Sequence, residues 1–98
     1  MTTFYPGELA DIYLYVKDAN GVAFDPTTVD SLDILDPSRT SILEAAITTG
    51  WENPAPGTYV YTYQTPLTPI YPYIIARWKY TSDGYEDYEE VRINLKGA

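Results

Sequence analysis

Apolar and polar residues alternate with a period of two along residues 56–63, 73–80 and 91–95. These segments are rich in β-branched and aromatic residues, and each is bounded by Gly, Pro or Asp. Alternation with this composition is typical of half-buried β-strands. The pattern predicts three consecutive strands, at residues 58–64, 73–81 and 86–96.

The dipeptide Asp83-Gly84 lies between the last two predicted strands. It is typical of a two-residue hairpin turn, because both central residues of such a turn adopt positive φ. If Ser82 faces Tyr85 across this turn, the register of the whole hairpin is fixed. The resulting pairs are Ala76 with Val91, Ile74 with Ile93, and Arg77 with Glu90. Apolar side chains then meet on one face and opposite charges on the other, which supports the hairpin.

The N-terminal part of the chain shows the same alternation over residues 9–17 and predicts a first strand there. Its core face consists of four apolar residues, Ala10, Ile12, Leu14 and Val16. The segment Asp18–Gly21 that follows is typical of a three-residue loop, with Asp beginning a type I turn and Gly in the left-handed region. This loop places Phe24 opposite Val16, so that Phe24 joins the core.

Turn residues divide the next part of the chain into predicted strands at 22–25, 29–35 and 41–48. The segment Asp36–Thr40 is a predicted turn, and if Asp36 faces Ser41 the register pairs Ile34 with Leu43 and Leu32 with Ala45. Residues 41–48 also fit a short helix, although the flanking turns favour a strand. The Pro- and Gly-rich segments 50–57 and 66–72 are predicted to be loops.

Seven short strands in about 100 residues, separated by turns, are typical of an immunoglobulin-like sandwich. We therefore expect an all-β protein, a single seven-stranded antiparallel immunoglobulin-like β-sandwich that spans residues 1–98 as one domain. Trp78 points inward on the sixth predicted strand and is expected to fill the centre of the core. Tyr59, Tyr61 and Tyr63 share one face of the fifth, and the pattern leaves open whether that face is the buried one.

The composition excludes several classes of function. The chain has no Cys and no His, which excludes an ordinary zinc, iron or copper site. A net charge of −8 argues against nucleic-acid binding, and no apolar run has the length of a membrane helix. A Ser or Thr nucleophile would need Lys17, Lys79 or Lys96 as its base, and these lie on outward positions or near the chain end. We therefore expect no enzymatic activity, no cofactor and no metal.

Acidic residues are the remaining source of metal chemistry. Asp18, Asn20 and Asp25 flank one turn, but they do not reproduce the spacing of a dedicated calcium loop. They are interpreted as ordinary turn-forming residues, with a weak calcium site left open. The acidic segment 83–90 is interpreted as a solvated hairpin tip, and its alternative is a docking patch for a basic partner.

Eleven tyrosines are the most unusual feature of the composition. Tyrosine favours strands and also favours protein interfaces. The aromatic residues that a sandwich core needs least are predicted to form a contact surface for a partner protein. These candidate partner-binding residues are Phe4, Tyr5, Tyr13, Tyr15, Trp51 and Tyr71.

Several short segments resemble small single-domain immunoglobulin-like proteins of tailed-bacteriophage virions. They are Phe4-Tyr5-Pro6-Gly7-Glu8, Asp18-Ala19-Asn20-Gly21, Pro56-Gly57-Thr58-Tyr59 and Tyr73-Ile74-Ile75-Ala76-Arg77-Trp78. Similar patterns occur in immunoglobulin-like modules of bacterial surface and macroglobulin-type proteins. The absence of an export signal favours the virion, because virion proteins are made in the host cytoplasm and released by lysis.

The resemblance implies a non-enzymatic structural protein of the virion, most specifically a capsid decoration or cement protein that binds the shell in many copies. Its partners would be the major capsid protein or other virion proteins, with a homo-oligomer left open, and with neither nucleic acid nor membrane. The alternatives are a neck or tail protein of the virion, or a freestanding carbohydrate- or protein-binding module.

Overall fold

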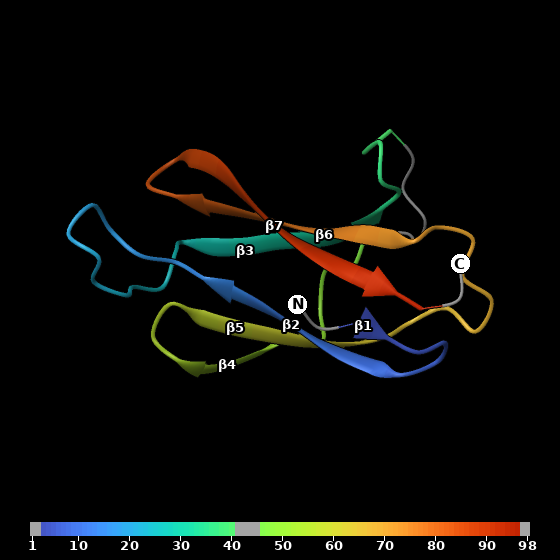
Figure 1. The fold of residues 1–98 in the computed structure, drawn as a ribbon. Coiled ribbons are helices and arrows are strands. Elements are labelled where there is room, and N and C mark those ends of the chain that lie inside the picture. The colour runs from blue at the N-terminus through green and yellow to red at the C-terminus, as the bar shows by residue number, and fades with distance from the viewer. Residues whose placement is uncertain (1–2, 41–45, 97–98) are drawn as a thin grey trace.

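The computed structural model describes residues 3–40 and 46–96, and it places these in an all-β fold of seven strands in two sheets (Figure 1). The strands are β1 (Thr3–Phe4), β2 (Leu9–Tyr15), β3 (Thr28–Leu35), β4 (Glu52–Ala55), β5 (Thr58–Gln64), β6 (Tyr73–Ser82) and β7 (Tyr85–Leu95). Within these residues no helix is long and apolar enough to cross a membrane.

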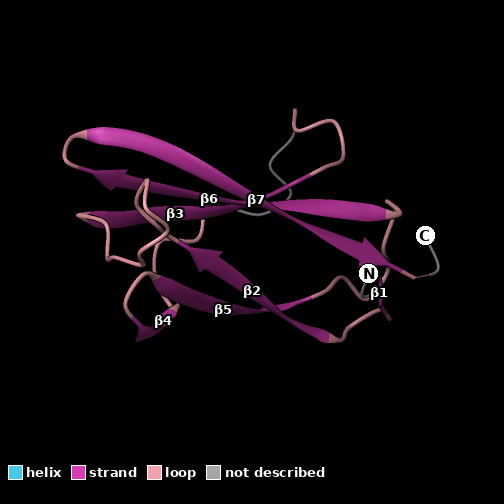
Figure 2. Ribbon diagram, turned by 60° about the vertical axis from the view of Figure 1, so that its left-hand side comes forward, coloured by secondary structure: helices cyan, strands magenta, loops and turns pink. Residues whose placement is uncertain are grey.

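One sheet has the strand order β1-β7-β6-β3 and the other β2-β5-β4. The two sheets lie face to face, as Figures 1 and 2 show from two directions. All pairs are antiparallel except β1 and β7, which pair in parallel through Thr3 with Asn94 and Phe4 with Leu95. The first sheet is therefore mixed, which corrects the expectation of a wholly antiparallel fold.

The β6–β7 hairpin has the register predicted from its turn. Ser82 pairs with Tyr85 and Ala76 with Val91, and Arg77 lies opposite Glu90. Asp83 and Gly84 have φ angles of 51° and 82°. Both turn residues thus occupy the left-handed region that a two-residue hairpin requires.

The loop after β2 also has the predicted form, but no strand follows it. Gly21 has a φ of 80°, its N–H donates to Asp18 O, and Phe24 N–H donates to Val16 O. Only a single bridge, between Lys17 and Ala23, stands where a strand at 22–25 was expected. Pairing stops at Phe24 because β5 occupies this side of β2 from there on: Val16 N–H donates to Gly57 O, and Tyr15 pairs with Thr58.

The predicted strand at 41–48 falls partly outside the described residues, since 41–45 are not among them. Residues 46–48 form no strand, and Leu32 bridges to Ile47 through two backbone hydrogen bonds of 2.8 and 3.0 Å. The predicted pairing of Leu32 with Ala45 is thus wrong by two residues. The turn itself is closed by the Arg39 N–H, which donates to Asp36 O, and the Asp36 side chain accepts the Thr40 N–H and the Ser38 hydroxyl.

Two short strands stand where none was predicted. The two-residue β1 precedes the first predicted strand, and β4 lies in the segment 50–57 that was predicted to be a loop. Pro54 lies inside β4, whose pairing with β5 is irregular between Glu52 and Ala55. Such a strand is tolerated because β4 is an edge strand, where a missing N–H costs no ladder bond.

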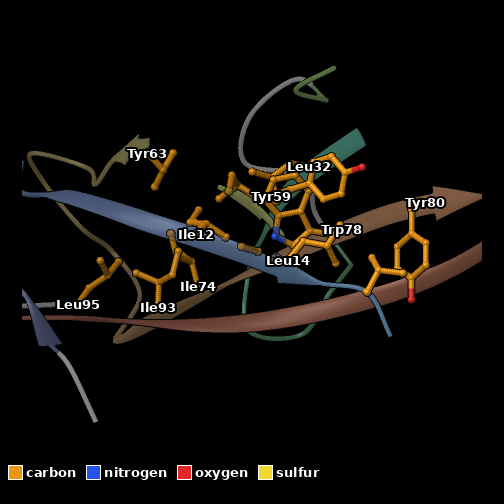
Figure 3. Packing of buried hydrophobic residues seen from close by; sticks show 13 residues of the cluster. Ile12, Leu14, Leu32, Tyr59, Tyr63, Ile74, Trp78, Tyr80, Ile93 and Leu95 are labelled. Carbon is orange, nitrogen blue, oxygen red and sulfur yellow. The ribbon is translucent and has the colours of Figure 1, made fainter. Parts of the chain in front are cut away.

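The core fills the space between the sheets, and Trp78 is its largest fully buried side chain. Figure 3 shows Trp78 among Leu14, Leu32 and Tyr59. Trp51 packs edge-on against Trp78, with ring centroids 5.6 Å apart and planes inclined by 71°. Tyr59 and Tyr63 are buried, so the tyrosine face of β5 is the inward one.

Candidate functional site

The solvent face of β2 carries a pair of exposed tyrosines. The strand alternates strictly between exposed and buried residues, because every second side chain faces the other sheet. Tyr13 and Tyr15 are 41% and 57% exposed. Their rings lie nearly parallel, with centroids 5.7 Å apart and an angle of 5° between the planes. The two tyrosines thus form one stacked unit on the surface.

β2 is also an edge strand, and its outer backbone groups face solvent. Thr65 N–H donates to Glu8 O and Val16 N–H donates to Gly57 O, at both ends of the β2–β5 ladder. Hydrogen-bonded pairs alternate along an antiparallel ladder, so the even-numbered residues of β2 bond to β5. The N–H and C=O groups of Asp11, Tyr13 and Tyr15 consequently point away from the sheet.

β7 runs past this free edge on the other sheet, and the two strands lie one above the other in Figures 1 and 2. β1 covers β7 only at Asn94 and Leu95. A groove of about 320 Å³ lies between the two strands. It is lined by Asp11, Tyr13, Leu14, Tyr15, Glu89, Glu90 and Val91.

The rim of this groove is acidic. Glu90 is held by Arg39, whose Nε lies 2.9 Å from Oε1, and by Arg77, whose Nε lies 3.1 Å from Oε2. Partial burial alone raises the pKa of Glu90, but the hydrogen bonds from Arg39 and Arg77 outweigh it, and the net shift of the pKa is downward. No cation pairs with Glu89 within residues 3–40 and 46–96. The groove therefore keeps an uncompensated negative charge.

A second hollow, of about 180 Å³, lies at the other end of the molecule. Its lining is mainly apolar and consists of Pro66, Thr68, Pro69, Ile70, Tyr71, Ile74 and Leu95. Leu67 and Ile70 beside it are each 76% exposed. Tyr5 stands near the same end, because the 5–8 segment bonds to Thr65 and Pro66, and Lys96 Nζ lies 6.0 Å from the Tyr5 ring centroid.

The structure divides the six predicted contact residues into three groups. Tyr13 and Tyr15 lie together near the end of β2, and Tyr5 and Tyr71 lie near the end of the sandwich where β2 begins. Phe4 and Trp51 are only partly exposed and pack against the core. The expectation that the core has little need of these two aromatics is therefore wrong, because each fills space at a margin of the sandwich.

Sequence reasoning missed the position of Asp11 and Glu89 beside the tyrosines. The sequence feature that came closest was the acidic segment 83–90, which was also considered as a docking patch for a basic partner and which lies mostly on β7. Nothing in the spacing of the chain shows that β2 and β7, some 70 residues apart in sequence, flank one groove. That juxtaposition follows only from the packing of the two sheets.

A cluster of hydrogen-bonding groups surrounds Asp25. Its Oδ1 accepts the Gly57 N–H at 2.8 Å, the Asn53 amide at 3.2 Å and the Tyr59 hydroxyl at 3.2 Å. The Gly57 N–H, and next the Asn53 amide, lower the pKa of Asp25. Burial, and then the Asp25 charge, raise the pKa of Tyr59. The cluster ties the 24–26 segment to the β4–β5 turn.

The three lysines that were considered as possible bases are all at least partly exposed. Lys79 pairs with Glu86 at 3.5 Å, and Lys17 and Lys96 are exposed. No group of three or more carboxylates among the described residues is close enough to hold a metal ion. What the surface offers is contact area, free backbone hydrogen-bonding groups and charge.

No protein-family model, curated protein or solved structure matches this chain.

Proposed function

We propose that this protein is a non-enzymatic structural protein that acts by binding other proteins, most specifically a capsid decoration protein of a tailed bacteriophage. In this role many copies would bind the shell through the exposed tyrosines, and the acidic remainder of the surface would stay in water. A neck or tail protein of the same virion is the nearest alternative.

We propose further that the fold is an immunoglobulin-like sandwich. In that fold the second, fifth and fourth strands are neighbours in one sheet, and the third, sixth and seventh in the other. The orders β2-β5-β4 and β7-β6-β3 support this assignment. The parallel β1–β7 pair places the first strand on the second of these sheets.

The observation that carries the functional proposal is the Tyr13–Tyr15 pair on a free sheet edge. Buried Tyr side chains often dominate the binding energy of protein interfaces. A tyrosine on a solvent face is common in strands, but two stacked tyrosines beside unpaired backbone groups present both apolar area and hydrogen-bonding groups. This combination suits a protein partner.

The geometry of the same pair argues against the carbohydrate-binding alternative. A sugar stacks on an open ring face, and a sugar-binding platform would hold its aromatic rings side by side in one plane. Tyr13 and Tyr15 are instead stacked on one another, with an interplanar angle of 5°. Part of one face of each ring is thus turned toward its neighbour.

Replacing Tyr13 and Tyr15 together with Ser tests the proposal. We expect the double variant to lose binding to capsid shells assembled from the capsid protein encoded next to this gene, as measured by co-sedimentation. Its melting temperature should stay close to that of the parent protein, because both side chains are exposed. Thr62→Ser, on the solvent face of β5, is the matched control and should bind as the parent does.

Two results would contradict the proposal. If the double variant unfolds, the tyrosines support the fold and not an interface. If it folds and still occupies the shells fully, this face is solvent surface. Absence of binding by the parent protein would exclude the decoration role and leave the other virion positions and the freestanding module.

A further inference from the structure

We infer that the groove between β2 and β7 binds an extended, basic segment of the partner protein, which adds to the β2–β5–β4 sheet as a further strand on β2. The inference rests on the proposed function as a protein-binding module and specifies the chemistry of the partner. It draws on three features of the groove: its backbone edge, its charge and its aromatic wall.

The backbone edge of β2 is long, regular and unprotected. Its seven residues pair with β5 without a bulge, and the outward groups of Asp11, Tyr13 and Tyr15 bond to no strand among residues 3–40 and 46–96. Proteins usually protect such edges with Pro, Lys, a bulge or a covering segment. None of these devices is present on β2.

The edges of β4, β3 and β1 are protected, whereas β7 has no partner strand on its outer side from Tyr85 to Ile93 among the described residues. β4 carries Pro54 and an irregular register, and the edge of β3 is bridged by Ile47 at Leu32. β1 is only two residues long. Of the two open edges, that of β2 carries the exposed tyrosine pair, so a strand added there would gain both the missing backbone partners and an aromatic contact.

The charge of the groove selects the chemistry of the incoming strand. Asp11 and Glu89 line it, and Asp87 continues the acidic row along β7. Glu86, by contrast, is paired with Lys79. Lys or Arg at alternate positions of an added strand would lie on the face that carries Asp11 and the two tyrosines, and Glu89 across the groove adds to the negative field. The same charge disfavours a second copy of this chain, since each copy carries a net charge of −8 and would bring an identical acidic rim.

The aromatic wall complements a basic strand. Tyr13 and Tyr15 stand on the outer side of the edge, and an aromatic face attracts a Lys or Arg side chain within about 6 Å of its centre. The protein already uses this contact elsewhere, where the Arg92 guanidinium lies 3.8 Å from the centroid of the Tyr73 ring. Leu14 and Val91 provide an apolar lining for the β-branched positions of the strand.

The test uses three synthetic peptides with the full-length protein. The probe is acetyl-Lys-Thr-Lys-Thr-Lys-Thr-amide, which alternates positive charge with a β-branched residue. In the second peptide Pro replaces Thr, which keeps the charge but removes alternate backbone donors. In the third Glu replaces Lys. Binding is followed by amide hydrogen exchange, which reports on each backbone N–H separately.

We expect the Lys-Thr peptide to slow exchange at the outward amides of Asp11, Tyr13 and Tyr15 by about tenfold or more at saturation. The Lys-Pro and Glu-Thr peptides should not slow it. The affinity for the Lys-Thr peptide should fall severalfold between about 0.05 and 0.5 M salt, because these exposed charges are screened.

Variants separate the contributions of charge and backbone. Glu89→Gln combined with Asp11→Asn should weaken Lys-Thr binding about fivefold or more, whereas Glu52→Gln on the opposite edge strand should not change it. Tyr13→Pro removes an outward N–H and should bind more weakly than Tyr13→Thr. If Tyr13→Pro proves unfolded, the charge variants and the exchange pattern still decide.

Binding of the Lys-Pro peptide as tight as that of the Lys-Thr peptide would overturn the inference, because it would show general attraction to an acidic protein. So would an unchanged exchange pattern at β2. A concentration-dependent dimer that Tyr13→Pro dissociates would assign the edge to a second copy instead. If shell binding depends on Tyr13 and Tyr15 but the peptide does not bind, the proposed function stands and only strand addition fails.

Discussion

Trp78 shows how one side chain organises the core. It is fully buried, lies opposite Glu89 on one neighbouring strand and Leu32 on the other, and meets Trp51 edge-on. Its indole N–H has no hydrogen-bond partner among the described residues. Trp78 is therefore held by packing and not by polar contacts. The loss of stability on truncating its side chain depends on the lost burial and on the size of the cavity that remains.

We expect Trp78→Ala to lower the free energy of unfolding by about 3–5 kcal/mol, since it truncates a buried aromatic at the centre of the core. Urea unfolding followed by circular dichroism measures this change. Tyr85→Ala is the control, because Tyr85 is 80% exposed and should change stability little. A melting temperature lowered by only a degree or two would show that Trp78 contributes little packing.

At the scale of single residues, sequence alternation predicted the buried positions of β2 and β6 well. It did not decide the tyrosines of β5, because Tyr59, Tyr61 and Tyr63 face Val60 and Thr62 across a strand with no clearly polar side. The inward choice depends on partners from distant segments, such as Asp25, which accepts the Tyr59 hydroxyl. A pattern within one strand carries no information on such partners.

At the scale of elements, the strand register was predicted correctly where the turn sequence allows only one turn geometry. Asp83-Gly84 and Asp18–Gly21 are turns whose φ angles specify one register, and both hairpins have it as far as they extend. Asp36–Thr40 lacks a glycine, Arg39 adopts a φ of 63°, and the pairing that follows begins only after residues 41–45, which lie outside the described residues. The register beyond it was therefore missed, and β1 and β4 were missed because they are too short to show a period.

Gly57 holds the β4–β5 turn close to the end of β2. Its φ is 71°, and a Cβ there would lie 2.5 Å from Val16 O and 2.9 Å from Phe24 N. These two backbone atoms are hydrogen-bonded to each other, since Phe24 N–H donates to Val16 O. They have little room to move aside.

Gly57→Ala should therefore lower the free energy of unfolding by about 2–4 kcal/mol, from a strained left-handed φ together with overpacking. Gly21→Ala is a matched control, since Gly21 has a φ of 80° but nothing lies within 4 Å of its Cβ position. Gly21→Ala should lower the free energy of unfolding only by the strain of a left-handed φ in alanine, about 1–2 kcal/mol. Equal losses in thermal or urea unfolding would show that the close contact at Gly57 is relieved by a shift of the turn.

At the scale of the whole molecule, the surface divides along the long axis. The β6–β7 hairpin with its acidic residues lies at one end, and the apolar 66–72 loop lies at the other (Figure 1). The groove beside β2 lies between these two ends. Its negative charge comes from Asp11 on β2 and from the acidic residues of β7. We expect the negative electrostatic field of the hairpin to attract a positively charged partner to this side of the molecule. Salt should weaken this attraction.

The acidic residues also link stability to pH, and Asp25 tests this link most directly. Hydrogen bonds from Gly57 and Asn53 lower its pKa in the folded protein below the ordinary value of 3.8. The folded state thus favours the ionised carboxylate. Its contribution to stability is complete above pH 3.8 and is lost as the pH falls through the lower pKa of the folded state.

Asp25→Asn should accordingly lower the melting temperature at pH 7, because the amide is a weaker acceptor for three donors. The difference from the parent protein should shrink as the pH falls below 3.8, where the parent carboxylate loses its own charge. Asp83→Asn at the hairpin tip removes the same charge and tolerates its φ of 51°, so it controls for the change in net charge. Thermal melts from pH 7 to about pH 2.5 measure both variants. A gap for Asp25→Asn that stays constant over this range would show that the bonds to Gly57, Asn53 and Tyr59 do not depend on the ionised carboxylate.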